Sequence, residues 1–167
     1  MWRWLLWGTL ISICACAAPT AGTLRGPLSA EALRSVDAKW QAAFASAEPD
    51  PAASRELASV APGAEITVVL GTWCGDSRRE VSRFVRALEL AGNVPFGVSY
   101  IGVDRKKEAP GFDAKAMGVR FVPTFIVKRD GSEVGRVVES SPEGIERDVL
   151  ALLRGHKHGV VTGRTDL

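Results

Sequence analysis

The segment Gly71-Thr72-Trp73-Cys74-Gly75-Asp76-Ser77 lies between an apolar run and a long amphipathic stretch. The run before it, residues 66–70, has the composition of a buried strand in a parallel sheet. The stretch after it, residues 75–91, places its apolar side chains at helical spacing. Cys74 is therefore predicted to stand at the N-terminus of a helix, directly after a buried strand.

This position gives Cys74 a predicted chemistry. Unpaired backbone N–H groups at the start of a helix carry partial positive charge and stabilise an anion, and the thiolate is the nucleophilic form of cysteine. Ser77 is expected on the same helix face, where it can donate a hydrogen bond to the thiolate, whereas Asp76 adds an opposing charge. A lone cysteine is most often a small buried apolar residue, but the flanking Trp73 and Gly75 favour a reactive thiol here.

A second segment, Gly118-Val119-Arg120-Phe121-Val122-Pro123-Thr124-Phe125, leads into another predicted strand. Together the two segments resemble the thioredoxin superfamily, which has a Trp-Cys-Gly-x-x active-site turn and a Val-Pro-Thr loop with a cis proline. The resemblance covers residues 65–153. It implies an α/β thioredoxin fold with a central mixed β-sheet flanked by helices, here with an N-terminal helical extension. It also implies that Val122, Pro123 and Thr124 bind substrate, with the backbone of Val122 pairing with an extended peptide.

The sequence departs from this family at two positions. Ser77 replaces the second cysteine, which in dithiol enzymes attacks the mixed disulfide and releases the substrate, and a serine hydroxyl cannot do so. Val68 stands where relatives often have a buried acid. Both changes argue against a general dithiol reductase, and the Cys-Gly-Asp-Ser turn resembles a recurring monothiol subgroup of exported thioredoxin-like proteins.

The first functional hypothesis is therefore monothiol thiol–disulfide exchange through a mixed disulfide on Cys74, resolved by an external thiol. The alternative is a non-catalytic thioredoxin-fold module that binds exported cysteine-containing proteins. A third reading, an oxidant sensor or peroxide scavenger acting through a sulfenic acid, lacks the Thr/Arg arrangement of a peroxidase. No cofactor and no metal are expected, since His156 and His158 have no evident third ligand.

The remaining elements support one α/β domain. Ser29 is expected to cap a helix over residues 30–47, and Asp50-Pro51 to open a second helix ending near Val60. The other expected elements are strands at residues 96–103, 124–128 and 134–138, with a turn at Asp130-Gly131, and helices at residues 112–117 and from Ser141-Pro142 to about Leu153. Strands alternating with helices, followed by a hairpin, predict a mixed sheet.

The first eighteen residues have a different character. One positive charge, a short apolar run and then small residues are typical of a signal peptide, residues 1–18. Ile13-Cys14-Ala15-Cys16 resembles a lipobox, in which Cys16 would be lipidated; ordinary cleavage after Ala17 or Ala18 is the other route. We expect a linker at residues 19–28, the thioredoxin-like domain at residues 29–153 and a flexible tail at residues 154–167.

Charge and composition bound the partners. The chain has 167 residues, 24% of them charged, and a net charge of +2, which gives no electrostatic case for binding nucleic acid. Export predicts a periplasmic protein, soluble or attached to a membrane through a lipid on Cys16. The expected partners are exported proteins or small thiols bearing disulfides, and the expected state is a monomer.

Overall fold

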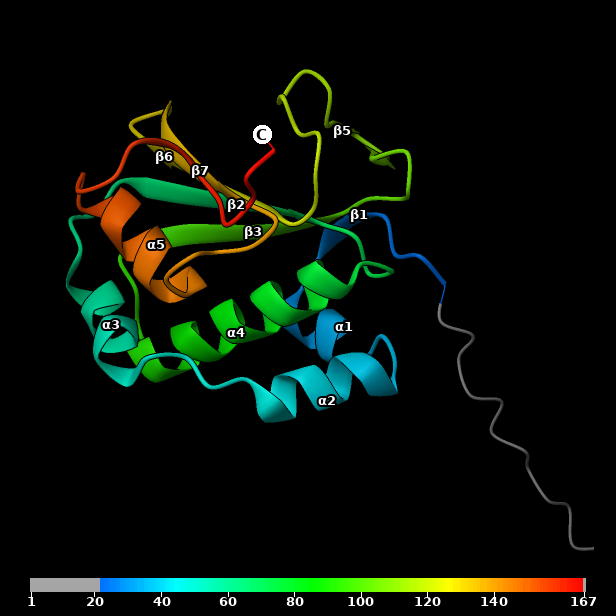
Figure 1. The fold of residues 1–167 in the computed structure, drawn as a ribbon, viewed down its shortest axis with the longest axis horizontal. Helices are drawn as coiled ribbons and strands as arrows, with labels where there is room; N and C mark the ends of the chain where they lie inside the picture. Colours follow the sequence, from blue (N-terminus) through cyan, green and yellow to red (C-terminus); the bar gives the residue numbers. More distant parts are fainter. Residues whose placement is uncertain (1–21, 167) are drawn as a thin grey trace, which may run out of the picture.

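A six-stranded mixed sheet forms the centre of the fold in the order β1-β3-β2-β6-β7-β8 (Figure 1). The computed structural model describes residues 22–166, so the predicted signal peptide and Cys16 lie outside the described residues. β2 runs parallel to β3 and antiparallel to β6. The strands of this sheet are β1 (Gly26–Leu28), β2 (Ala64–Leu70), β3 (Phe96–Gly102), β6 (Thr124–Arg129), β7 (Ser132–Val138) and β8 (Gly159–Val161).

The central strands carry apolar side chains on both faces. In β2, Val68 joins the larger apolar cluster and its neighbour Val69 joins a smaller one. In β6, Phe125 and Ile126 divide in the same way. This alternation follows from the two-residue period of a strand, and it explains why these segments read as nearly continuous apolar runs.

Helices cover one face of the sheet (Figure 1). α4 (Gly75–Ala91) and α5 (Ile145–Leu153) lie on the strands, and Phe84 of α4 meets Phe125 edge to face with ring centroids 5.4 Å apart. Three shorter helices and one 3₁₀ turn form the N-terminal extension, and α2 and α3 pack against α4. These elements are α1 (Ala30–Arg34), α2 (Ala38–Ser46), α3 (Pro51–Glu56) and η1 (Leu57–Ser59).

The other face of the sheet is covered by the segment 104–121. It contains a short hairpin of β4 (Glu108–Ala109) and β5 (Phe112–Asp113). The helix predicted at residues 112–117 is wrong, because Phe112 and Asp113 pair with β4. The Asp113 carboxylate also accepts a hydrogen bond from the Ala116 amide at 2.9 Å, which closes a turn rather than a helix.

The N-terminal helix is broken where one continuous helix was predicted. Asp37 accepts a hydrogen bond from the Trp40 amide at 2.8 Å and so caps the start of α2. The two predicted caps are confirmed: Ser29 accepts from the Ala32 amide at 3.0 Å, and Asp50 accepts from the Ala53 amide at 2.8 Å. In one continuous helix the Trp40 amide would donate to a backbone carbonyl of the preceding turn. Because the Asp37 side chain accepts this hydrogen bond instead, a new helix begins here.

Both ends of the described chain are more ordered than predicted. The last three residues of the expected linker form β1, which pairs antiparallel with β3. The expected tail, residues 154–167, contains β8, which pairs parallel with β7 and buries Val161. The tail is held because Gly155, with a φ of 71°, turns the chain back and Lys157 contacts the buried Asp148 at 2.6 Å. α5 begins at Ile145 rather than Ser141, since Gly144 precedes it with a φ of 103°.

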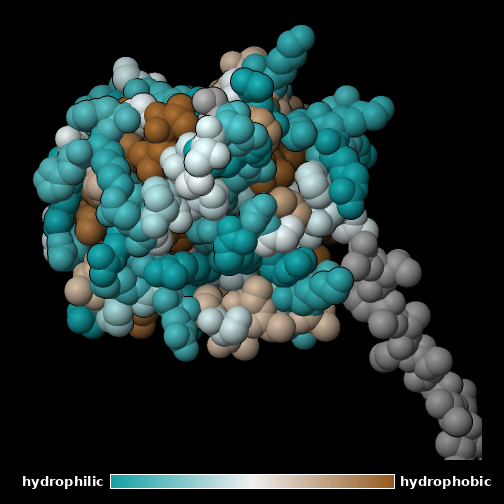
Figure 2. Space-filling view, viewed as in Figure 1, coloured by the Kyte–Doolittle hydropathy of each residue, from teal (hydrophilic) through white to brown (hydrophobic). Residues whose placement is uncertain are grey.

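Hydrophilic residues predominate on the face shown in Figure 2, and hydrophobic ones show mainly between them. Leu90 and Val160 are the large apolar side chains that are exposed within residues 22–166. No helix in this part of the chain is both long enough and apolar enough to cross a bilayer.

Candidate functional site

Cys74 is the N-cap residue of α4, as predicted, and is half-buried. Its backbone N–H donates to the Gly71 carbonyl at 2.9 Å, and its carbonyl accepts from the Arg78 amide at 3.1 Å. The strand, the tight turn and the helix therefore place the thiol at the positive end of a 17-residue helix.

The proline loop meets this thiol. Cys74 Sγ donates a hydrogen bond to the Val122 carbonyl at 3.3 Å, and the Val122–Pro123 peptide bond is cis. Thr124 is buried, and its hydroxyl donates to the Phe121 carbonyl at 2.8 Å, which closes the loop around the proline. Two segments far apart in the sequence thus form one site.

Trp73 supports one side of the turn. Its indole Nε1–H donates to the Val103 carbonyl at 3.0 Å, and the Arg105 guanidinium lies over its ring, 4.6 Å from the centroid. A Cβ placed on Gly71 would come within 2.6 Å of this ring. Glycine at position 71 is therefore required by the close approach of the tryptophan.

The topology and the site together decide the fold. A parallel β2-α4-β3 unit precedes an antiparallel β6-β7 hairpin and α5, with the cysteine after β2 and the cis proline before β6. The chain has the thioredoxin fold.

Solved structures that resemble this chain share its fold at low sequence identity. A protein of unknown function from Pseudomonas aeruginosa matches with a TM-score of 0.54 and 19% identity, over 72% of this chain and 87% of its own. An HIV epitope scaffold gives a TM-score of 0.53 and 19% identity, over 71% and 87%. A thioredoxin variant from Halobacterium salinarum gives a TM-score of 0.40 and 22% identity, over 59% and 78%. No protein-family model matches the sequence, and no curated protein matches it.

Ser77 lies in the first turn of α4, three residues after Cys74. Its side chain is fully buried, and its hydroxyl accepts a hydrogen bond from the Gly71 amide at 3.1 Å. The expected hydrogen bond to the Cys74 sulfur is not among the contacts of the described residues. Ser77, a residue of α4, thus fixes the turn that precedes this helix.

Asp76, in the first turn of α4, is paired with Arg79. Asp76 accepts a hydrogen bond from Arg79 at 2.7 Å, and Arg79 also contacts Glu80 at 3.0 Å. The opposing charge that the sequence assigned to Asp76 is therefore compensated by the guanidinium one turn on. Gly75 is exposed, and a Cβ added there would meet only the tip of the Arg78 side chain, at 3.9 Å.

Val68 of β2, six residues before Cys74, is fully buried in the larger apolar cluster, so this position carries no acid. The buried acid nearest in sequence is Glu80, in α4. Burial raises the pKa of the Glu80 carboxyl above its ordinary value, and the neighbouring guanidinium groups of Arg79 and Arg83 only partly oppose this shift.

Sequence reasoning missed two groups that position the site. Trp40 of α2, which is fully buried, donates its indole N–H to the Thr72 carbonyl at 2.9 Å. The Thr72 hydroxyl in turn accepts from the Leu24 amide at 3.2 Å. Arg105, which follows β3 in the segment 104–121, lies over the Trp73 ring. No sequence signal pairs these residues, because each contact joins segments distant along the chain.

Within residues 22–166 there is no group of three or more side chains suited to hold a metal ion. His156 and His158 are both exposed.

Proposed function

We propose that this chain carries out monothiol thiol–disulfide exchange through Cys74. The observation that carries the proposal is the half-buried sulfur at the start of α4, 3.3 Å from the carbonyl of the residue before the cis proline. Among residues 22–166, Cys74 Sγ makes one hydrogen bond, which it donates to the Val122 carbonyl. This hydrogen bond is lost when the thiol loses its proton, and the carbonyl is then free for a substrate.

The proposed reaction conserves electrons. The Cys74 thiolate attacks one sulfur of a substrate disulfide, the S–S bond breaks, and the other substrate sulfur leaves as a thiolate. Val122, Pro123 and Thr124 hold the extended substrate segment beside the new mixed disulfide. Because Ser77 offers no second thiol, an external or substrate thiol then attacks the mixed disulfide and restores Cys74.

Introducing a resolving thiol tests this mechanism directly. After reaction with a model disulfide, a chain carrying Cys14→Ala and Cys16→Ala, in which Cys74 is the remaining cysteine, is expected to accumulate a one-to-one adduct visible by intact mass. Ser77→Cys is expected to release that adduct and form a bond between positions 74 and 77. Ser82→Cys is the matched control: it is buried on the same helix but eight residues from Cys74, about 12 Å at 1.5 Å per residue. That separation is too long for a disulfide.

Two outcomes would refute the proposal. One is a Cys74 that reacts with the model disulfide no faster in the folded chain than in the chain unfolded by urea. The other is adduct formation that persists when Cys74→Ala is combined with Cys14→Ala and Cys16→Ala.

A binding module without turnover is the second candidate function. It is favoured by the buried Ser77 in place of a resolving thiol and by the engagement of the thiol with Val122. This function predicts that Cys74→Ala keeps the same exported partners as the unchanged chain and that the complexes resist reductant. Complexes that disappear in Cys74→Ala and dissolve in reductant support exchange instead.

We further propose that the protein is exported to the periplasm as a monomer, with disulfide-bearing exported proteins or small thiols as substrates. Residues 1–18 support this proposal by their sequence alone. Intact mass of the mature chain separates the two processing routes, because a lipidated chain begins at Cys16 with added acyl mass and Cys16→Ala abolishes it. A mature chain that retains Met1 would overturn export by this signal.

A further inference from the structure

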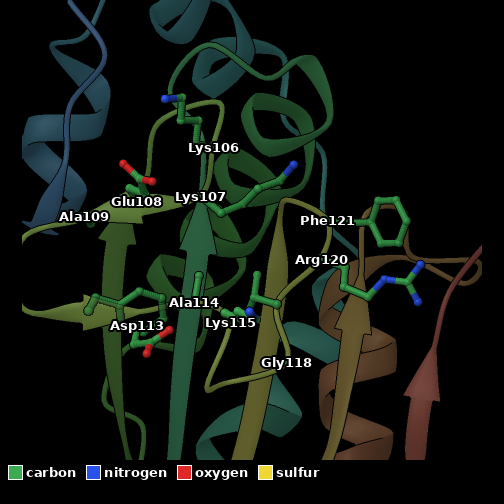
Figure 3. Close-up of a pocket in the computed structure, with 12 residues that line it drawn as sticks. Lys106, Lys107, Glu108, Ala109, Asp113, Ala114, Lys115, Gly118, Arg120 and Phe121 are labelled. Atoms are coloured by element: carbon green, nitrogen blue, oxygen red, sulfur yellow. The ribbon is translucent and has the colours of Figure 1, made fainter.

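A groove of about 800 Å³ lies between the β4–β5 segment and residues 118–121 (Figure 3). This volume falls in the range of about 300–1,000 Å³ that is usual for ligand sites. Ala114 and Val119, which line the groove, belong to the same apolar cluster as Val122, and Cys74 packs against that cluster. The groove and the thiol therefore share one apolar wall.

Both sides of the groove are joined to the site through adjacent residues. Phe121 lines it and directly precedes Val122, whose carbonyl accepts the thiol hydrogen bond. Lys106 lines it on the other side and directly follows Arg105, which lies over Trp73. The groove thus begins one residue from Val122 on one side and one residue from Arg105 on the other.

The charge of the groove is positive. Its lining includes four cations, Lys106, Lys107, Lys115 and Arg120, and two carboxylates, Glu108 and Asp113, which leaves a net charge of +2. Among residues 22–166, none of these four cations takes part in an ion pair. The whole chain also has a net charge of +2, so the groove carries as much net positive charge as the entire chain.

We propose that this groove binds an acidic polypeptide segment next to a disulfide-bonded cysteine, and that it thereby selects acidic substrates for Cys74. The inference rests on the proposed exchange function for its biological meaning, but the binding step stands by itself. Unpaired ammonium groups over an apolar floor attract carboxylates, and the attraction weakens with salt because exposed charges are screened.

A binding experiment on the full-length Cys74→Ala chain tests the groove without any exchange chemistry. Labelled peptides with serine in place of cysteine, flanked by Glu and Asp or by Lys, are titrated and followed by fluorescence anisotropy. The acidic peptide is expected to bind about tenfold more tightly than the lysine peptide at low salt. This difference is expected to shrink as salt rises, in keeping with a Debye length of about 8 Å at 0.15 M.

Matched charge variants locate the effect. Lys106→Ala with Lys115→Ala is expected to weaken acidic-peptide binding about fivefold, in line with about 0.2–1 kcal/mol per exposed ion pair. Lys39→Ala with Arg55→Ala removes the same charge from the exposed surfaces of α2 and α3 and is expected to leave binding unchanged. Equal binding of the two peptides, or equal losses in the two double variants, overturns the inference.

Two further arms separate this inference from its alternatives. Exchange rates of the unchanged chain with the same peptides as mixed disulfides test Cys74: preferential binding without exchange removes the proposed function and leaves the groove assignment intact. Exchange at equal rates with the acidic and the lysine peptides removes the groove assignment and leaves the proposed function intact. Phosphatidylglycerol vesicles test whether an anionic membrane occupies the groove. If the unchanged chain binds these vesicles and Lys106→Ala with Lys115→Ala abolishes this binding, the peptide assignment is overturned.

Discussion

Gly71→Ala is the change that most directly tests how the turn holds Trp73. The added Cβ would lie 2.6 Å from Cε2, and 2.8 Å from Cζ2 and Nε1, of the Trp73 ring. These atoms belong to a rigid ring rather than to the end of a flexible chain, so the whole indole has to move. Gly71 does not have a positive φ, and the expected effect is therefore steric rather than conformational.

The magnitude follows from what the indole loses. Displacement breaks the Nε1–H bond to the Val103 carbonyl, which contributes about 0.5–1.5 kcal/mol, and the Arg105 contact, which contributes about 0.5–1 kcal/mol. Overpacking adds about 1–3 kcal/mol. Because the indole is half-buried and can relax in part toward solvent, we expect a loss of about 2–4 kcal/mol in the free energy of unfolding.

Gly75→Ala is the internal control on the other side of Cys74. Its Cβ meets only Arg78, at 3.9 Å, and alanine favours the helix by up to about 1 kcal/mol over glycine. Urea unfolding followed by circular dichroism should therefore show opposite signs for the two substitutions. A loss below about 0.5 kcal/mol for Gly71→Ala, or equal losses for both variants, would refute the steric argument.

Three further predictions concern the helical side. Trp40→Phe leaves the buried Thr72 carbonyl unpaired and is expected to lower the free energy of unfolding by about 1–3 kcal/mol in urea titrations. Glu80→Gln is expected to raise the thermal midpoint at pH 7 more than at pH 4, because burial raises the pKa of Glu80 and its ionised form destabilises the fold as pH rises above 4.5. The pKa of Glu146 lies below its ordinary value of 4.5. Burial alone would raise this pKa, but hydrogen bonds from Arg83 and from the Asp50 amide lower it by more. Its stabilisation is thus present above pH 4.5 and is lost as pH falls through the lower folded-state pKa, and Glu146→Gln should flatten that acid limb in thermal scans.

The elements that the sequence predicted best are those decided by local patterns. α4 begins at Gly75 and ends at Ala91, as its apolar spacing and the following Gly92 indicate. The caps at Ser29 and Asp50 were equally local, since each is a side chain binding an amide three residues on. The site was predictable to the same extent: the cysteine, the proline and the elements that carry them are each recognisable within a few residues.

The elements that the sequence predicted wrongly are those decided by pairing across the fold. Phe112 and Asp113 join β4, and residues 159–161 join β7, although neither segment has a strong strand pattern of its own. The partner of Ser77 was missed for the same reason. Its hydroxyl was expected to face the thiol, but the turn brings the Gly71 amide closer, and a buried amide needs an acceptor.

The hydrogen bond between the Gly71 amide and the Ser77 hydroxyl gives a structural reason for serine rather than cysteine at position 77. Three hydrogen bonds hold the turn from Gly71 to Trp73. Trp40 donates to the Thr72 carbonyl, and Trp73 donates to the Val103 carbonyl. The Gly71 amide donates to the Ser77 hydroxyl. A thiol at position 77 would be a weaker acceptor for that buried amide. Ser77→Cys should therefore lower the free energy of unfolding by about 0.5–1.5 kcal/mol while it allows the adduct on Cys74 to be released. A variant that releases the adduct at no loss of stability would show that the serine is not needed to hold the turn.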